Sequence, residues 1–213
     1  MISFIKDAIF IFMGIKYVLL FTILGFIGGI FIALGLIIMN YSLFKYPIKL
    51  YISIFRGIPL ICQIAAFIYL FPKNLSTKIL CLMAFILNTS AYLFEVFRNF
   101  INNIPSEQIE TAMGLGLNKK QITRLIIIPQ MLKSSIPLFI AEIVSLSKEV
   151  SILGAFGIME IFTRGKIISS ESYNYTRGIL IVGVLYYCIT LILSKLEKLP
   201  WIKKRMIKNN KHN

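Results

Sequence analysis

Charged and hydroxyl side chains interrupt an apolar stretch in the second half of the chain. Glu142, Ser145, Lys148 and Glu149 lie within a run over about 131–156 that is otherwise mostly aliphatic and aromatic. The two acids are seven residues apart, about two helical turns, so they share one helix face, and Ser145 falls between them on that face. An ionisable group inside an apolar span is costly and is a functional candidate by default. The pattern predicts an acidic stripe that lines a pathway through the membrane and faces a cationic group on the cargo.

The alternative is that these acids serve structure alone, by pairing with Lys148 or Arg98. Lys148 points off the stripe, and we expect it to face Glu95 or the membrane interface. Another apolar run carries Asn88, Ser90 and Glu95. Asn88 and Ser90 are candidates for the same pathway. The alternative for them is hydrogen bonding between helices, which is the commoner use of such groups in lipid.

A third cluster stands near the predicted start of a run over about 52–71. It consists of Arg56, Gly57 and Pro59. The glycine and the proline should distort a helix at this point. We interpret Arg56 either as a gate residue or as a cation that snorkels from a helix end to the interface.

The elements that must position these residues are membrane-spanning helices. Hydrophobic residues make up 57% of the chain and charged residues 15%, with a mean hydropathy of +0.80. A soluble domain carries about a quarter charged residues. We expect one all-α integral membrane domain over residues 1–213 with five transmembrane helices of roughly 20 residues each. The expected spans cover about 17–39, 52–71, 79–97, 131–156 and 179–196, followed by a basic tail over 197–213.

The orientation follows from the distribution of Lys and Arg. With the amino terminus outside, fifteen of them face the cytoplasm and seven face outward, with Lys148 left out because it lies within a span. The positive-inside rule therefore favours N-terminus out and C-terminus in. Gly25, Gly29 and Ala33 recur every four residues in the first span, which predicts a face for close helix packing.

Several function classes are disfavoured by composition. The net charge of +14 comes mostly from cations that flank apolar runs, so we expect contact with lipid and no nucleic-acid partner. The three cysteines have no CxxC spacing, and the only histidine is His212, so no metal site is expected. No credible nucleophile–base pair is present, which leaves no catalytic residue to assign and points away from an enzyme.

One long polar break, SEQIETAMGLGLNKKQITRLIIIPQ, faces the cytoplasm in this topology, within a loop over about 105–130. Ser106 is a candidate helix cap, Gly116 is placed to end the helix, Asn118 is a fair cap for a second helix, and Pro129 marks the beginning of the fourth span. A short rigid helix outside the membrane suits docking into a groove on a soluble partner, and a plain structured loop is the alternative.

The same break resembles the E-A-A-x(3)-G-x(12)-P motif of ABC-importer permease subunits. Glu110, Thr111, Ala112, Gly116 and Pro129 match without a gap, and threonine replaces the middle alanine. The resemblance implies that this loop is the coupling helix that sits in a cleft of a separate cytoplasmic ATPase.

Three further segments resemble elements of the polar amino acid branch of that family. They are FRGIPLICQ over 55–63, LNTSAYLFEVFRNFINNI over 87–104 and EIVSLSKEVSILGAFGIMEI over 142–161. Together the matches cover about 20–177 in the expected order. Where the branch has Asp-Thr in its K-D-T-S element, this chain has Glu149 and Val150, which leaves the substrate preference open.

The resemblance implies a type I ABC importer (MetI-like) permease fold in a bacterial cytoplasmic (inner) membrane. The expected function is ATP-driven import of polar amino acids by alternating access, with glutamine as the default substrate and basic amino acids favoured if the acid pair lines the path. The expected partners are an ATPase dimer, a second identical or paralogous permease copy and an extracytoplasmic solute-binding protein. The chain has no phosphate-binding loop, so ATP and Mg²⁺ would belong to the ATPase and no cofactor to this chain. The alternative is an ion-gradient-driven secondary amino acid transporter, which leaves the 106–130 segment unexplained.

Overall fold

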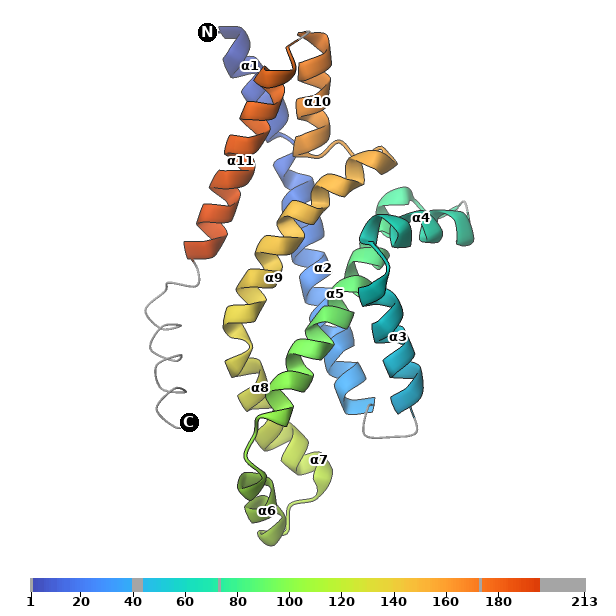
Figure 1. The fold of residues 1–213 in the computed structure, drawn as a ribbon, viewed down its shortest axis with the longest axis vertical. Helices are drawn as coiled ribbons and strands as arrows, with labels where there is room; N and C mark the ends of the chain where they lie inside the picture. The colour runs from blue at the N-terminus through green and yellow to red at the C-terminus, as the bar shows by residue number, and fades with distance from the viewer. Residues whose placement is uncertain (1, 40–43, 73, 173, 196–213) are drawn as a thin grey trace.

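The molecule is elongated, and its longest helices lie roughly along its long axis (Figure 1). The computed structural model describes residues 2–39, 44–72, 74–172 and 174–195. Within these ranges every regular element is helical, in agreement with the expected all-α class. The expected basic tail, 197–213, lies outside the described residues, as does Leu196 at the end of the last expected span.

Three stretches of the described chain are long and apolar enough to cross a membrane. A fourth candidate passes only as a bent pair of helices, and the expected fourth span is not among the candidates. The five-span arrangement and its orientation therefore stay predictions. The three continuous stretches are Phe4–Met39, Thr77–Asn102 and Tyr175–Lys195.

The first stretch contains an additional helix that the sequence pattern did not separate. Helix α1 (Ile2–Phe12) precedes α2 (Ile15–Met39), with a short break at Met13 and Gly14. The expected span 17–39 therefore corresponds to α2, and α1 extends the same apolar stretch toward the amino terminus.

Helix α2 packs chiefly along α5 (Thr77–Asn102). The predicted small-residue face is confirmed, because Gly25, Gly29 and Ala33 are all buried on α2. A Cβ atom added to Gly29 would lie 2.7 Å from the Thr89 Cγ2 on α5. The absence of a side chain thus sets how closely the two backbones approach.

The second expected span is wrong as a single straight helix. The structure has α3 (Lys45–Gly57) and α4 (Leu60–Leu70), bent by 111° at the intervening residues. The predicted distortion is confirmed in position: Pro59 removes a backbone donor, and the chain at Ile58 is extended. The segment begins at Lys45 and not near Ile52, so Arg56 lies in the last turn of α3, at the bend, and not at the start of a span.

The fourth expected span is divided into three pieces. These are α8 (Ile128–Ser134), α9 (Ile136–Glu149) and a 3₁₀ helix, η2 (Val150–Phe156). Pro137 cannot donate a backbone hydrogen bond to the preceding turn, which accounts for the break at Ser135.

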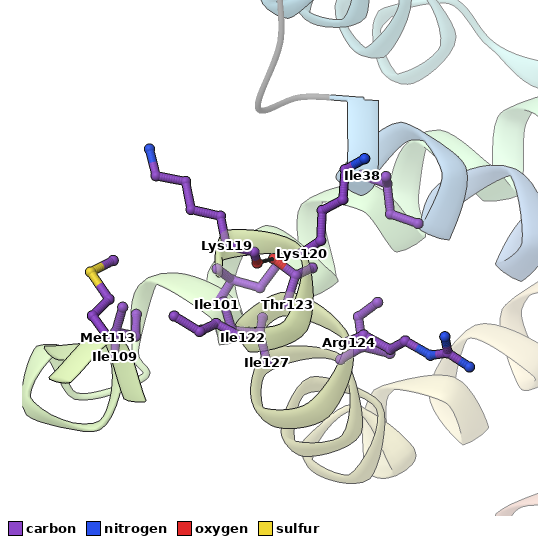
Figure 2. A pocket seen from close by; sticks show the side chains of 11 residues that line it. Ile38, Ile101, Ile109, Met113, Lys119, Lys120, Ile122, Thr123, Arg124 and Ile127 are labelled. Carbon is purple, nitrogen blue, oxygen red and sulfur yellow. Dashed lines mark hydrogen bonds between the residues drawn. The ribbon is translucent and has the colours of Figure 1, made fainter. Parts of the chain in front are cut away.

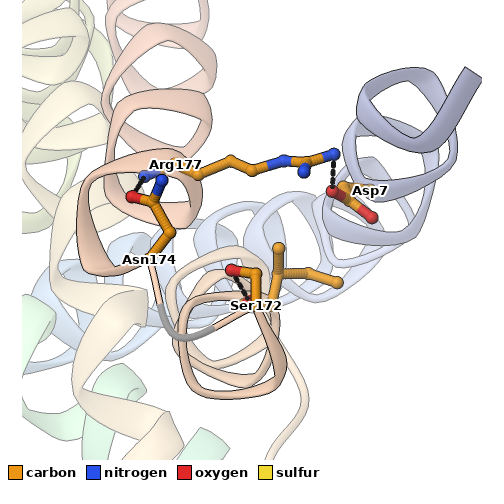
Figure 3. Close-up of polar contacts among 5 residues, drawn as sticks. Asp7, Ser172, Asn174 and Arg177 are labelled. Atoms are coloured by element: carbon orange, nitrogen blue, oxygen red, sulfur yellow. Dashed lines mark hydrogen bonds and ion pairs between the residues drawn. The ribbon is translucent and has the colours of Figure 1, made fainter. Parts of the chain in front are cut away.

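The fifth expected span is observed as α11 (Tyr175–Lys195), and a shorter α10 (Ile161–Glu171) packs against it. Asp7 of α1 forms an ion pair with Arg177 of α11 (Figure 3). Arg164 of α10 donates to the Phe10 carbonyl at 3.2 Å. These contacts fasten the first helix to the last two.

The buried residues form three clusters. The largest joins α1, α2, α5, η2, α10 and α11, and a second joins α2, α3, α5 and α8. The third is small and lies under the polar segment, between Ala112, Ile122 and Ile127. That segment comprises α6 (Ser106–Gly114), α7 (Lys119–Ile122) and a π-helix, η1 (Thr123–Ile127).

Candidate functional site

The polar segment projects beyond the ends of α5 and α8 as a compact helical hairpin (Figure 1). Gly116 ends α6 as predicted, with a φ of +83° that favours glycine. Its N–H donates to the Met113 carbonyl at 2.9 Å, and the Leu117 N–H donates to the Ala112 carbonyl at 3.1 Å. This pair of bonds is a Schellman cap, which satisfies carbonyls that the helix end leaves open.

The second helix begins with a capping box, again at the predicted residue. The Asn118 side chain accepts from the Gln121 N–H at 3.0 Å, and the Gln121 side chain accepts from the Asn118 N–H at 2.9 Å. The predicted cap at Ser106 is wrong. Pro105 occupies the cap position, and Ser106 is already the first helical residue, without a side-chain cap bond.

Helix α6 has one face turned inward and another turned out. Ala112 is 3% exposed, because it packs on the small cluster below α7 and η1. Gln108 accepts a hydrogen bond from Gln130 of α8 at 3.0 Å, which ties α6 to the helix that leads into the bundle. Glu110 and Thr111 are exposed on the opposite side. A rigidly mounted helix therefore presents its acidic face away from the bundle.

Pro129 lies inside a continuous helical run and does not interrupt it. Its missing N–H removes the bond that an α-helix would make to the Leu125 carbonyl. The chain widens to the π-helix over Thr123–Ile127 just before the proline, and α8 follows directly. Helix α7 is thus joined to α8 by unbroken helix.

The acids of α9 lie together as the spacing predicted. Glu142, Ser145 and Glu149 are half-buried, whereas Lys148 is exposed. The Ser145 hydroxyl donates to Glu149 Oε1 at 3.4 Å. Among the described residues no ion pair involves Glu142 or Glu149. The charge of Lys148 still acts on Glu149 from a distance, so the structural alternative and the pathway both stay predictions.

Of the two options expected for Lys148, an ion pair with Glu95 is not observed, and Lys148 is exposed. Glu95 pairs instead with Arg98 at 2.8 Å, one turn along α5, and with Arg56 at 3.8 Å. The Arg56 guanidinium also stacks over the Tyr92 ring. Arg56 is therefore held at the α3–α4 bend by α5.

Asn88 and Ser90 bond to α3, which fits the alternative of hydrogen bonding between helices. The Asn88 amide donates to the Phe55 carbonyl at 3.0 Å, and Ser90 Oγ lies 2.6 Å from the Tyr51 hydroxyl. Both residues are buried. Their place in a substrate pathway stays a prediction, without support from this arrangement.

Two important residues were not singled out from the sequence. Gln63 donates to the carbonyls of Phe55 and Ile58, which the break after α3 leaves without helical partners. Its position at the end of FRGIPLICQ was the available signal. Glu160 is fully buried and accepts from the N–H groups of Phe162 and Thr163, capping α10. The motif over 142–161 contains it, but nothing in its spacing distinguishes a cap from a pathway acid.

Comparisons with known proteins agree with this architecture. A Rickettsia typhi protein with the provisional name glutamine transport system permease protein GlnP is 35% identical over 217 residues, covering 98% of each chain. The arginine transport system permease protein ArtQ of Bacillus subtilis is 30% identical, covering 92% of this chain and 90% of its own.

Solved structures give the same result. A crystal structure of an amino acid ABC transporter with histidines superposes with a TM-score of 0.84 at 30% identity, covering 95% of this chain and 97% of that one. The inward-facing MetNI methionine ABC transporter shares the fold at a TM-score of 0.70 and 16% identity, covering 89% and 95%. Residues 25–198 match the family described as binding-protein-dependent transport system inner membrane component. The chain belongs to this family of ABC-importer permeases.

Proposed function

We propose that this chain is the membrane-spanning subunit of an ATP-driven importer of polar amino acids in a bacterial cytoplasmic membrane. In this proposal α6 and α7 dock on a separate ATPase subunit, which binds ATP and Mg²⁺. Closure of the ATPases moves α6, and α7, η1 and α8 carry the displacement into α9, so that the pathway opens alternately to either side.

The single observation that carries the coupling step is the construction of α6. A nine-residue helix is capped at Gly116, tied to α8 by Gln108 and Gln130, and packed inward through Ala112. Its outward face bears Glu110, and Leu115 at its end is 78% exposed. A flexible loop would not require these contacts, whereas a helix that transmits a displacement must be held rigidly by them.

The proposed substrate class rests on the relatives and on α9. Relatives with names for glutamine and arginine transport are similar over more than nine-tenths of this chain. No ion pair between described residues involves Glu142 or Glu149. Acids without an ion pair favour a cargo with an ammonium or guanidinium group, so we propose a polar or basic amino acid.

The proposed assembly contains a second permease copy, identical or paralogous, related by a two-fold axis. An extracytoplasmic solute-binding protein delivers the substrate. The family description, which refers to binding-protein-dependent transport, supports this partner.

The test is a pull-down of the tagged chain from native membranes, assayed for a bound ATPase subunit and for ATP hydrolysis. Wild type is compared with Glu110→Lys and Gly116→Asp. The matched controls are Glu171→Lys, which reverses an exposed acid on α10, and Gly114→Ala, whose added Cβ meets nothing within 4 Å.

We expect wild type and both controls to retain the ATPase, and Glu110→Lys and Gly116→Asp to lose it while remaining in the membrane. If wild type brings down no ATPase in a mild detergent, the coupling proposal is wrong, and a gradient-driven transporter becomes the reading to test. Equal loss with Glu171→Lys would show that α6 is not the docking element.

A further inference from the structure

An open groove separates the α6–α7 hairpin from the ends of the bundle helices (Figure 2). It has a volume of about 850 Å³ and lies between the last turns of α2 and α5 and the segment from α6 to α8. Ile38, Ile101 and Met113 each contribute an apolar wall from a different helix. We call it the basic groove, because its only charged lining residues within the described chain are cations: Lys119, Lys120 and Arg124.

The cations of the basic groove form no ion pair with any described residue. The ion pairs between described residues leave out all three of them, and no described residue that lines the groove is a carboxylate. All three are exposed. Three unneutralised cations beside one apolar surface match an amphiphile that carries a negative charge, and they match a free anion less well, because a free anion would leave the isoleucines in water.

The depth of the groove indicates where that amphiphile comes from. Ile38 is one residue from the end of α2, and Ile101 is one residue from the end of α5. Both helices are long and apolar enough to span a membrane, so the groove opens where the hydrocarbon ends and headgroups begin. Figure 2 shows Lys120 reaching toward Ile38 at this level. Glu110, on the outward face of α6, does not line the groove.

We propose that the basic groove binds an anionic phospholipid, with the headgroup phosphate between Lys120 and Arg124 and part of an acyl chain against the isoleucines and Met113. Basic pockets between spanning helices recognise such headgroups through charge and hydrogen bonding. The lipid would brace the hairpin against the ends of α2 and α5, which form the opposite wall of the groove. The proposal does not require the ATPase, and it stands or fails separately from the coupling step.

The test is lipid binding to the full-length chain, purified in a mild nonionic detergent, stripped of lipid and followed by native mass spectrometry. The probes are phosphatidylglycerol, phosphatidylcholine with the same acyl chains, and glycerol phosphate. The variant Lys120→Gln with Arg124→Gln removes two groove cations. The control Lys45→Gln with Lys49→Gln removes two cations from α3, outside the groove. Thermal melting of each variant shows whether it is folded.

We expect one phosphatidylglycerol per chain, with phosphatidylcholine and glycerol phosphate at least tenfold weaker. Each cation near an anionic headgroup raises the affinity for it about five- to sixfold. Losing both groove cations should therefore weaken phosphatidylglycerol binding roughly 30-fold. The α3 control should change phosphatidylglycerol binding by less than about threefold, because its two cations lie outside the groove and act on the lipid only through the screened surface potential. Equal loss in both variants, equal binding of phosphatidylcholine, equal binding of glycerol phosphate, or no retained lipid would each overturn the proposal.

Discussion

At the scale of single residues, the buried and half-buried acids differ in their hydrogen bonds and ion pairs. Glu160 caps a helix and accepts hydrogen bonds from two backbone N–H groups and the Thr163 hydroxyl. Glu95 lies between two arginines. Glu149 accepts a hydrogen bond from Ser145, and no ion pair between described residues involves Glu142 or Glu149. An acid without an ion pair is a candidate for meeting a cation on the cargo.

This difference predicts the effect of neutralising the stripe. Glu142→Gln and Glu149→Gln should each lower uptake of arginine by about tenfold or more, because a hydrogen bond to a charged group contributes about 1.5–3 kcal/mol. Uptake of glutamine should fall less. The measurement is uptake into proteoliposomes that contain the complete transporter, with Glu171→Gln as an exposed-acid control on α10. A parallel loss for both amino acids would assign the stripe to structure.

Gln63 gives a second residue-scale prediction. Gln63→Leu preserves bulk but removes the donor to the carbonyls of Phe55 and Ile58. Asn88 still serves Phe55, so the main loss is at Ile58. Leaving this part-buried carbonyl without a donor should cost toward the lower end of about 1–3 kcal/mol, which should lower the melting temperature of the purified chain. Gln130→Leu removes an exposed hydrogen bond between two side-chain amides and should leave the melting temperature nearly unchanged. Equal melting of the two variants would mean that Gln63 does not hold the bend.

At the scale of elements, the sequence identified what local pattern determines. The apolar runs of α2, α5 and α11 are long, and the caps at Gly116 and Asn118 depend on neighbouring residues only, so all of these were predictable. The bend of 111° after α3 was not, because its angle depends on Gln63 and Asn88 closing the break from other helices. Helix α10 is short and carries charged residues, so no hydropathy pattern indicated it.

The same reasoning explains why the site was only partly foreseen. The proposed coupling residues lie along one contiguous segment, and their geometry follows from turn chemistry. The ion pair between Glu95 and Arg56 depends on how α3 and α5 rotate against one another, which residue spacing along a single helix cannot fix.

The crossing of α10 and α11 gives a prediction for one element. A Cβ at Gly178 would fall on the backbone carbonyl of Gly165, so Gly178→Ala must separate the two helices. Overpacking of this kind costs about 1–3 kcal/mol. Gly183, five residues along the same helix, has nothing within 4 Å of its added Cβ. Gly183→Ala should leave the melting temperature unchanged or raise it slightly, as helix propensity favours alanine.

These two variants are compared by thermal melting in detergent, at equal protein concentration. The crossing is as tight as described only if Gly178→Ala melts clearly below both wild type and Gly183→Ala. Equal melting of the two would show that α10 can shift away from α11 without cost.

At the scale of the whole molecule, the two ends are built differently. At one end the Asp7–Arg177 ion pair (Figure 3) and the hydrogen bond from Arg164 to the Phe10 carbonyl hold α1, α10 and α11 together. At the other end the α6–α7 hairpin meets the bundle through α8 and borders an open groove. In an alternating-access cycle driven from the hairpin, the end that carries the hairpin would therefore move, while α1, α10 and α11 would stay joined at the other end.

That asymmetry makes the orientation of the chain a prediction of mechanism as well as of topology. An ATPase can reach α6 only if the hairpin faces the cytoplasm, and the fifteen-to-seven distribution of Lys and Arg favours the same side. In a background with Cys62, Cys81 and Cys188 replaced by Ala, we introduce Leu115→Cys at the end of α6 or Leu75→Cys in the exposed loop between α4 and α5. A membrane-impermeant maleimide should label Leu75→Cys in intact cells, and Leu115→Cys only in inside-out vesicles. Labelling of Leu115→Cys in intact cells would reverse the orientation and remove α6 from reach of any cytoplasmic ATPase, whatever its resemblance to a coupling helix.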